Sequence, residues 1–113
     1  MFFYDNVYLA PNVVVNAIDK VILEDEVMIG FNSVIVSGNH SALNGSFRFG
    51  KSVKTPVFVG KGAWVSANCT LTAGAKLPEG SLLAANSVLT KSISEKFVIF
   101  GGVPAKKIGT VQD

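Results

Sequence analysis

A large aliphatic residue recurs at every sixth position over much of this chain, and that period constrains the fold more than any other feature. From Val59 to Ser94 the sequence divides into consecutive hexads, each starting with Val or Leu. The first positions are Val59, Val65, Leu71, Leu77, Leu83 and Leu89. An amphipathic helix needs spacings of three and four residues, so a six-residue period excludes it.

The other positions of the hexad are also restricted. The fifth holds small residues, namely Ala63, Cys69, Ala75, Ser81 and Ser87. The fourth holds Gly62, Asn68, Gly74, Gly80 and Asn86. Gly and Asn accept positive φ at little cost, so a sharp corner is expected at each fourth position. An earlier block has the same phase, with first positions Leu23, Ile29 and Ile35 and fourth positions Asn12, Asn32 and Gly38.

Three six-residue sides close a triangular coil of 18 residues. Residues 18 apart then stack, Val59 on Leu77 and Val65 on Leu83, as parallel strands roughly 4.8 Å apart. A sandwich of short strands would instead show period-two alternation with irregular turns. The sequence therefore predicts one all-β domain over 1–113, a single-stranded parallel β-helix of hexapeptide repeats, with coils at about 7–40 and 57–94.

Two segments depart from the hexads. Over residues 41–56 the code degrades, and continuing the phase would bury the charge of Lys51, which is costly; we expect an extruded loop. Because Leu23 and Val59 lie 36 positions apart, an extra distorted coil is the alternative. Residues 95–113 are expected to form a short C-terminal cap over the open edge. Phe2, Phe3 and Tyr4 either shield the N-terminal edge or pack on a neighbour.

Composition limits where the chain works and what it binds. Hydrophobic residues make up 49% and charged residues 16% of the 113 residues, with mean hydropathy +0.42. No apolar run approaches the roughly 18 residues of a spanning helix. Self-association is therefore the better explanation of the apolar composition, and membrane insertion is not expected.

The N-terminus is a poor signal peptide, and a single cysteine fits a reducing cytoplasm. A net charge of +2 with scattered lysines does not indicate nucleic-acid binding.

His40 is the candidate catalytic residue. It is the only histidine, it stands where the coil gives way to the loop, and imidazole suits general-base work near neutral pH. A lone histidine is more often structural, so this assignment needs further support. One histidine and one cysteine cannot form a zinc site within one chain, and no metal is expected.

Further support comes from the order of motifs along the chain. The block ending in His40, the loop with Arg48, TPVFVGKGAWVSANCTL, LAANSVLTKS and FGGVPAKKI together resemble the maltose and galactoside O-acetyltransferase family and its relatives that acetylate surface polysaccharides and Nod factors. The resemblance runs from about Val7 to Ile108. It implies a left-handed β-helix, a handedness that the repeats themselves do not determine, since ordinary parallel crossovers are right-handed.

The resemblance also implies a function and a site. The chain would transfer acetyl directly from acetyl-CoA to a saccharide hydroxyl, in a groove between subunits of a homotrimer. His40 would be the general base, and Trp64 would form part of the pocket wall. The remaining family positions concern CoA: Ala67 and Ala85 along the pantetheine arm, Thr90 and Lys91 near the pyrophosphate, and Lys106 near the nucleotide. A backbone amide near Ala67 would stabilise the oxyanion.

Several alternatives stay open. Asn16 and Asp19 should lie near the His40 corner, where they would orient sugar hydroxyls or form a plain turn. Trp64 and the lysines could be ordinary surface residues. The whole chain could be a non-catalytic β-helix scaffold, or a truncated, inactive relative. A carbonic-anhydrase-like metal enzyme needs three histidines and is excluded in practice.

Overall fold

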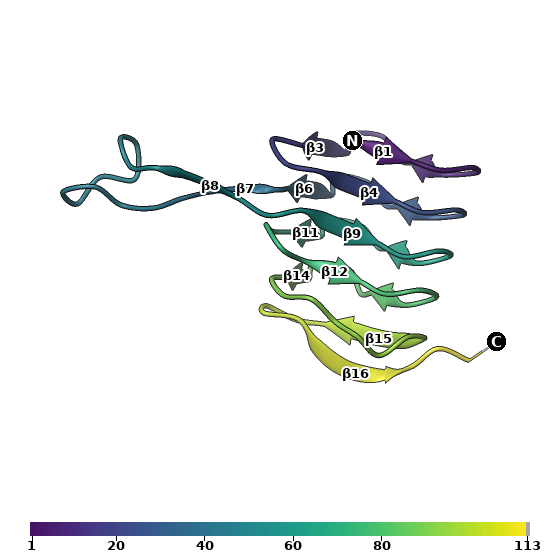
Figure 1. Cartoon of the computed structure of the whole chain (residues 1–113). Coiled ribbons are helices and arrows are strands. Elements are labelled where there is room, and N and C mark those ends of the chain that lie inside the picture. Colours follow the sequence, from purple (N-terminus) through teal and green to yellow (C-terminus); the bar gives the residue numbers. More distant parts are fainter. Residues whose placement is uncertain (113) are drawn as a thin grey trace.

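The computed structural model describes residues 1–112 as a triangular prism of three parallel β-sheets, with no helix among them. The short strands stack in coils from the N-terminal to the C-terminal end (Figure 1). Sheet A contains β1 (Phe2–Phe3), β4 (Val21–Leu23), β9 (Val57–Val59) and β12 (Lys76–Leu77). Sheet B contains β2 (Tyr8–Leu9), β5 (Met28–Ile29), β10 (Trp64–Val65), β13 (Leu82–Leu83), β15 (Val98–Gly101) and β16 (Lys106–Thr110). Sheet C contains β3 (Val14–Asn16), β6 (Val34–Val36), β11 (Thr70–Leu71) and β14 (Val88–Leu89).

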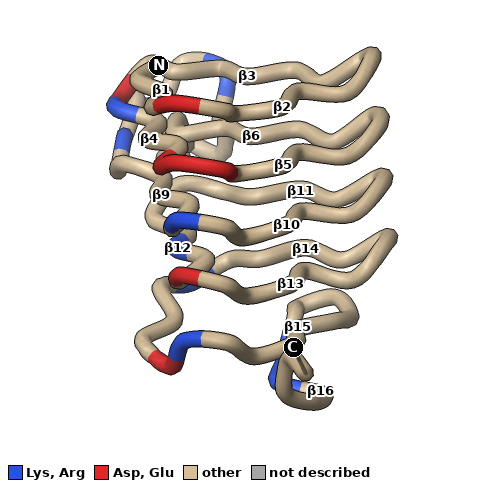
Figure 2. Tube along the Cα trace, turned by 90° about the vertical axis from the view of Figure 1, so that its right-hand side faces the viewer, with Lys and Arg blue, Asp and Glu red and all other residues tan. Residues whose placement is uncertain are grey.

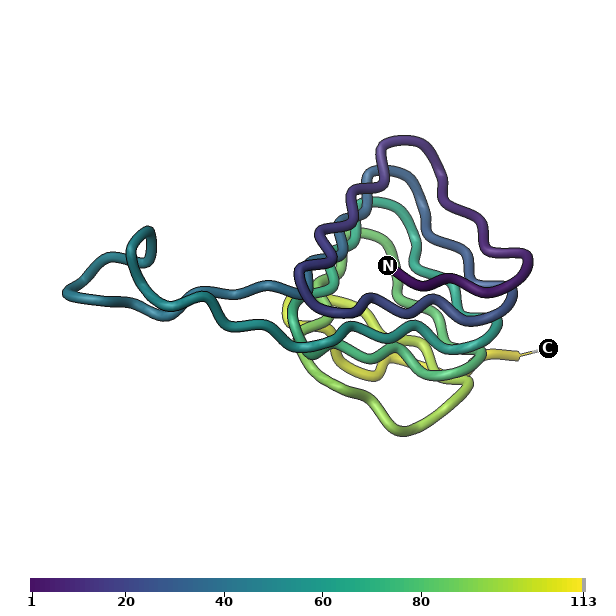
Figure 3. Tube along the Cα trace, turned by 45° about the horizontal axis from the view of Figure 1, so that its top comes forward, coloured from purple at the N-terminus to yellow at the C-terminus, as the bar shows by residue number. Residues whose placement is uncertain are grey.

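The register of the strands follows the 18-residue coil. Val59 pairs with Leu77, Val65 with Leu83, and Leu71 with Leu89. Seen from the N-terminal end, the chain turns counterclockwise as it recedes, so the coil is left-handed (Figure 3). The predicted fold class, a left-handed parallel β-helix, is confirmed.

The core lies along the axis of the prism. First-position residues from Leu23 to Leu89 are fully buried, and so are the small fifth-position residues such as Ala63 and Cys69. Outward-facing residues alternate with them along each strand, because successive side chains of a strand point to opposite faces. Each hexad therefore contributes one large and one small side chain to a continuous core.

Most of the positive φ values lie at the corners between sheets. We call them corner AB, corner BC and corner CA after the sheets they join. Corner BC has an Asn in this conformation in each coil, namely Asn12, Asn32, Asn68 and Asn86. Corner AB has Asn6, Glu26, Gly62, Gly80 and Phe97. The prediction of such a corner at Gly38 was wrong: its φ is not positive, and it begins β7 (Gly38–His40).

Residues 38–54 leave the coil at corner CA as a long hairpin, which we call the arm (Figures 1 and 3). Strand β7 pairs antiparallel with β8 (Ser52–Lys54), and Thr55 N donates to Ser37 O across the base at 3.0 Å. The coil therefore ends at Ser37 rather than at residue 40. Strand β4 pairs directly with β9, so the insertion is an arm and no extra coil is present.

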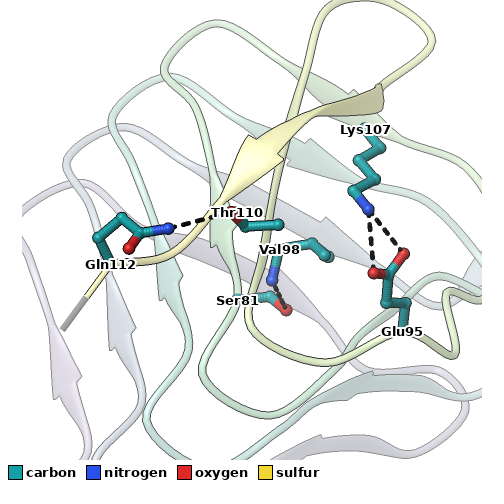
Figure 4. Close-up of polar contacts among 6 residues, drawn as sticks. All are labelled: Ser81, Glu95, Val98, Lys107, Thr110 and Gln112. Atoms are coloured by element: carbon teal, nitrogen blue, oxygen red, sulfur yellow. Dashed lines mark hydrogen bonds and ion pairs between the residues drawn. The ribbon is translucent and has the colours of Figure 1, made fainter.

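The C-terminal tail continues the helix before it covers the edge. Strand β15 pairs in parallel with β13 at a spacing of 17 residues, and β16 then folds back antiparallel on β15. Two buried serines hold the tail: Val98 N donates to Ser81 Oγ at 3.2 Å and Gly102 N to Ser87 Oγ at 3.0 Å. Figure 4 shows the Ser81 contact and the exposed Lys107–Glu95 ion pair. The residues after 94 thus add a partial coil as well as an edge strand.

The N-terminal edge is open in one chain. The first coil begins at β1, five residues earlier than the repeats predicted, because Phe2 and Phe3 pair with Ile22 and Leu23. Phe2, Phe3 and Tyr4 are all more than half exposed, so they do not shield the edge. Over residues 1–112, no helix has the length and apolar character needed to cross a bilayer.

Candidate functional site

His40 is the last residue of β7, close to the base of the arm. Its backbone pairs across the ladder with Ser52, and its N–H donates to Asn39 Oδ1 at 2.8 Å. The side chain is exposed, and within residues 1–112 its ring forms no hydrogen bond. The imidazole is therefore free to meet a ligand, while two strands fix its backbone.

Asn16 and Asp19 lie at corner CA, one coil from the base of the arm. Both are tied to the buried Ser37: its Oγ accepts from Asp19 N at 2.8 Å, and its N–H donates to Asn16 O at 3.0 Å. Asp19 Oδ1 also accepts from Lys20 N at 2.7 Å. These contacts place both residues on the corner that carries the arm.

Thr90 and Lys91 are on the same corner, two coils beyond the arm towards the C-terminus, directly after β14. Both side chains are exposed. Corner CA therefore carries three groups of predicted site residues in one column along the coil. They are Asn16 with Asp19, His40 on the arm, and Thr90 with Lys91.

Ala67 and Ala85 lie on corner BC, one coil apart, and Asn86 N donates to Ala67 O at 3.1 Å. The turns of this corner, residues 10–13, 30–33, 66–69 and 84–87, contain no charged residue. Figure 2 shows the same: the right-hand corners are bare of charge, whereas charged residues gather on the opposite side. Apart from the exposed Phe31, these turns carry only small or medium-sized, uncharged side chains.

Trp64 and Lys106 belong to sheet B. Trp64 points outward, 45% exposed, between Met28 and Leu82 in the neighbouring strands. Lys106 is exposed on the edge strand β16. In one chain the site residues therefore form two separate groups, with His40, Thr90 and Lys91 on corner CA and Ala67, Ala85 and Trp64 on corner BC and sheet B.

Sequence reasoning missed Ser37. It falls at the third position of a hexad, for which the repeat shows no residue preference. The sequence therefore does not distinguish it from an exposed serine. Only its complete burial reveals the bonds to the 16–19 turn. The available signal was its spacing of 18 from Asp19, which places the two residues in adjacent coils.

Charged side chains line corner AB without forming a ligand site. Two shallow hollows of about 290 and 330 Å³ share Glu24 and Glu79. Glu24 Oε1 accepts from Lys61 N at 3.1 Å, and Glu79 pairs with Lys96 at 3.4 Å, so both carboxylates link neighbouring coils. No group of three His, Cys, Asp or Glu suited to a metal ion occurs among residues 1–112.

Comparison with known proteins agrees with the motifs. WbbJ of Escherichia coli (strain K12), provisionally named a lipopolysaccharide biosynthesis O-acetyl transferase, is 31% identical over 121 residues, covering 96% of this chain and 59% of that protein. A hexapeptide-repeat acetyltransferase from Vibrio cholerae superposes with a TM-score of 0.87 at 24% identity, covering 99% of this chain and 62% of the other; it has also been solved with acetyl coenzyme A. A galactoside acetyltransferase in complex with coenzyme A gives 0.81 at 21%, covering 98% and 60%.

These relatives confirm the resemblance to hexapeptide-repeat acetyltransferases, although no family model matches the chain. The structural neighbours, all below 25% identity, support the fold. The chain spans about 60% of the length of the relatives named above.

Proposed function

We propose that this chain forms the coil of an acetyl-CoA-dependent O-acetyltransferase that acts on a saccharide hydroxyl. The observation that carries the proposal is the similarity to an O-acetyl transferase along 96% of the chain, with the only histidine on an arm above the Thr90–Lys91 corner. A scaffold would have no need of this combination.

The chemistry assigned to His40 is general-base catalysis. Its imidazole takes the proton of the acceptor hydroxyl while that oxygen attacks the thioester carbonyl of acetyl-CoA. The tetrahedral oxyanion then collapses, the CoA thiolate leaves, and it recovers the proton from His40. A backbone N–H near Ala67 would stabilise the oxyanion, provided that a neighbouring copy brings corner BC to the arm.

The groove for acetyl-CoA is proposed to run between two copies, along corner BC of one copy and onto corner CA of the other. Ala67 and Ala85 lack side chains long enough to cover their backbone, so a pantetheine arm can approach it. Lys91 and Lys106 are exposed cations suited to the phosphates at the nucleotide end. Thr90 adds a hydroxyl donor beside Lys91.

The acceptor side is proposed at Asn16, with Trp64 as a wall from another copy. The Asn16 side chain is exposed and can both donate to and accept from sugar hydroxyls. Asp19 has one carboxylate oxygen engaged with Lys20 N, so its main role is in the turn. The lipopolysaccharide in the name of WbbJ supports a saccharide acceptor.

A homotrimer is proposed because the two groups of site residues lie apart in one chain. Sheet B also presents an outward apolar column in register, namely Tyr8, Met28, Trp64, Leu82 and Ile99. Contiguous exposed apolar surface of this kind marks an interface between proteins. Light scattering should give the mass of a trimer, and a monomer would overturn the shared site.

The cytoplasm is the proposed location, because Cys69 is a free thiol and reducing conditions keep thiols unpaired.

Calorimetry with acetyl-CoA tests the proposed function directly. We expect saturable micromolar binding that Lys91→Ala weakens. Lys61→Ala is the matched control, because Lys61 is another exposed lysine, on corner AB, and should leave binding unchanged. A well-folded protein that binds no acetyl-CoA would favour the scaffold alternative, and equal loss in both variants would argue for non-specific charge.

A further inference from the structure

Ser37 stands where three segments meet at the base of the arm. Its N–H donates to Asn16 O at 3.0 Å and its carbonyl accepts from Thr55 N at 3.0 Å. Its Oγ accepts from Asp19 N at 2.8 Å and donates to Asp19 O at 2.9 Å. The residue is completely buried, and every polar group it has is used.

Gly38 adds a packing contact at the same point. A Cβ on Gly38 would come within 2.8 Å of Ile18 Cγ2, so the arm leaves the coil in direct contact with the 16–19 turn. From there the ladder of β7 and β8 runs through Gly38–Lys54 and Asn39–Val53 to His40–Ser52. His40 therefore lies three residues from Ser37 along a paired strand.

We propose that Ser37 is a positioning residue, which sets the direction in which the arm leaves the Asn16–Asp19 turn and thereby holds the His40 imidazole in place relative to the coil. This inference rests on the proposed function for its catalytic meaning, but the geometric part can be tested separately. Removing the hydroxyl would leave the part-buried Asp19 N–H without its acceptor. The arm would then change its angle or become mobile while the coil, held by its own ladders and core, stays folded.

The other buried serines do not share this position. Ser81 has a similarly buried hydroxyl that also bonds across coils, but it lies on corner AB and holds the tail. Ser81→Ala is therefore a matched control for Ser37→Ala: both remove one buried hydroxyl, and only one of them touches the arm.

The experiment uses the protein labelled with ¹⁵N-histidine, which gives signals from His40 alone because the chain has no other histidine. We expect one ordered set of His40 backbone and ring signals in the parent protein and in Ser81→Ala. In Ser37→Ala the signals should shift and lose order, with a melting temperature similar to that of Ser81→Ala. Unchanged His40 signals in Ser37→Ala would overturn the proposal.

Kinetics extends the test to function. Ser37→Ala should lower kcat roughly 10- to 100-fold with the KM for acetyl-CoA unchanged, and Ser81→Ala should lower neither. If Ser37→Ala does not fold, Ile18→Ala loosens the same junction from an exposed side chain and should give the same His40 changes; their absence would refute the proposal. A His40→Ala variant with full activity would refute the proposed base instead. The histidine label in the variants that keep His40 would still report whether Ser37 orders the arm.

Discussion

The ring of Phe97 lies against the α-carbon of Gly80, so closely that a Cβ on Gly80 would overlap Cδ1 and Cε1 of the ring. Both residues have positive φ, 64° for Gly80 and 58° for Phe97, and they occupy the same corner of successive coils. The last regular coil is thus closed by an aromatic ring that only glycine accommodates.

Gly80→Ala should therefore destabilise the protein in two ways. The left-handed conformation costs an alanine roughly 1–2 kcal/mol, and displacement of the Phe97 ring adds roughly 1–3 kcal/mol. Gly62→Ala is the control, because it has φ 71° at the equivalent corner with nothing within 4 Å of the added Cβ. Urea unfolding of both variants measures the difference, and equal losses would show that the ring contact contributes nothing.

Glu26 offers a stabilising substitution. It has φ 62° on corner AB and is exposed, in a conformation that asparagine tolerates far better. Glu26→Asn should raise the free energy of unfolding by about 0.5–1 kcal/mol. Glu26→Gln removes the same charge without the conformational benefit. If Gln stabilises as much as Asn, the gain comes from relief of repulsion with Glu24 and Asp25.

Cys69 predicts how stability depends on pH in the alkaline range. Burial raises the pKa of its thiol, against weaker lowering by backbone hydrogen bonds from Ser87, Asn86 and Ser66. Above the unfolded pKa of about 8.5, the unfolded chain loses this proton and the folded chain keeps it. Stability should thus be unaffected below that pH and fall as pH rises towards the folded pKa. The difference between wild type and Cys69→Ala in unfolding experiments from pH 7 to 10 isolates this effect, and a flat difference would contradict it.

His40→Ala should lower kcat by roughly 10²–10⁴ and leave both the melting temperature and acetyl-CoA binding unchanged, because the ring is exposed and forms no hydrogen bond within residues 1–112. Steady-state kinetics with a saccharide acceptor, together with calorimetry, measures all three. A variant with the parent rate would remove His40 from the mechanism.

The hexads predicted the coil because a single rule links each position to a backbone state and a degree of burial. Val59 and Leu77, or Ala63 and Asn68, could be placed from sequence because every coil repeats the same demand. Gly38 does not follow this rule. The absence of a side chain there permits the close contact with Ile18, and its φ is not positive. The spacing of 17 between Leu82 and Ile99 also escaped prediction, because the tail finds its register through contacts with Ser81 and Ser87 that have no periodic signal.

The site was predictable only to the extent that its residues follow the family motifs. Their grouping on corners CA and BC depends on which side of the triangle each hexad occupies, and that could be counted from the sequence. The role of Ser37 could not, because burial at a third position depends on the arm leaving the coil beside it.

The arm also has a consequence for how this architecture changes over time. Val59 follows Leu23 in sheet A with the same pairing that any two successive coils show, so the coil continues as though residues 38–54 were not there. Beyond the His40–Ser52 pair, such an insert can be lengthened, shortened or exchanged without moving any core residue. Recognition of the acceptor, proposed near the arm, can then diverge while the groove for the donor is inherited intact.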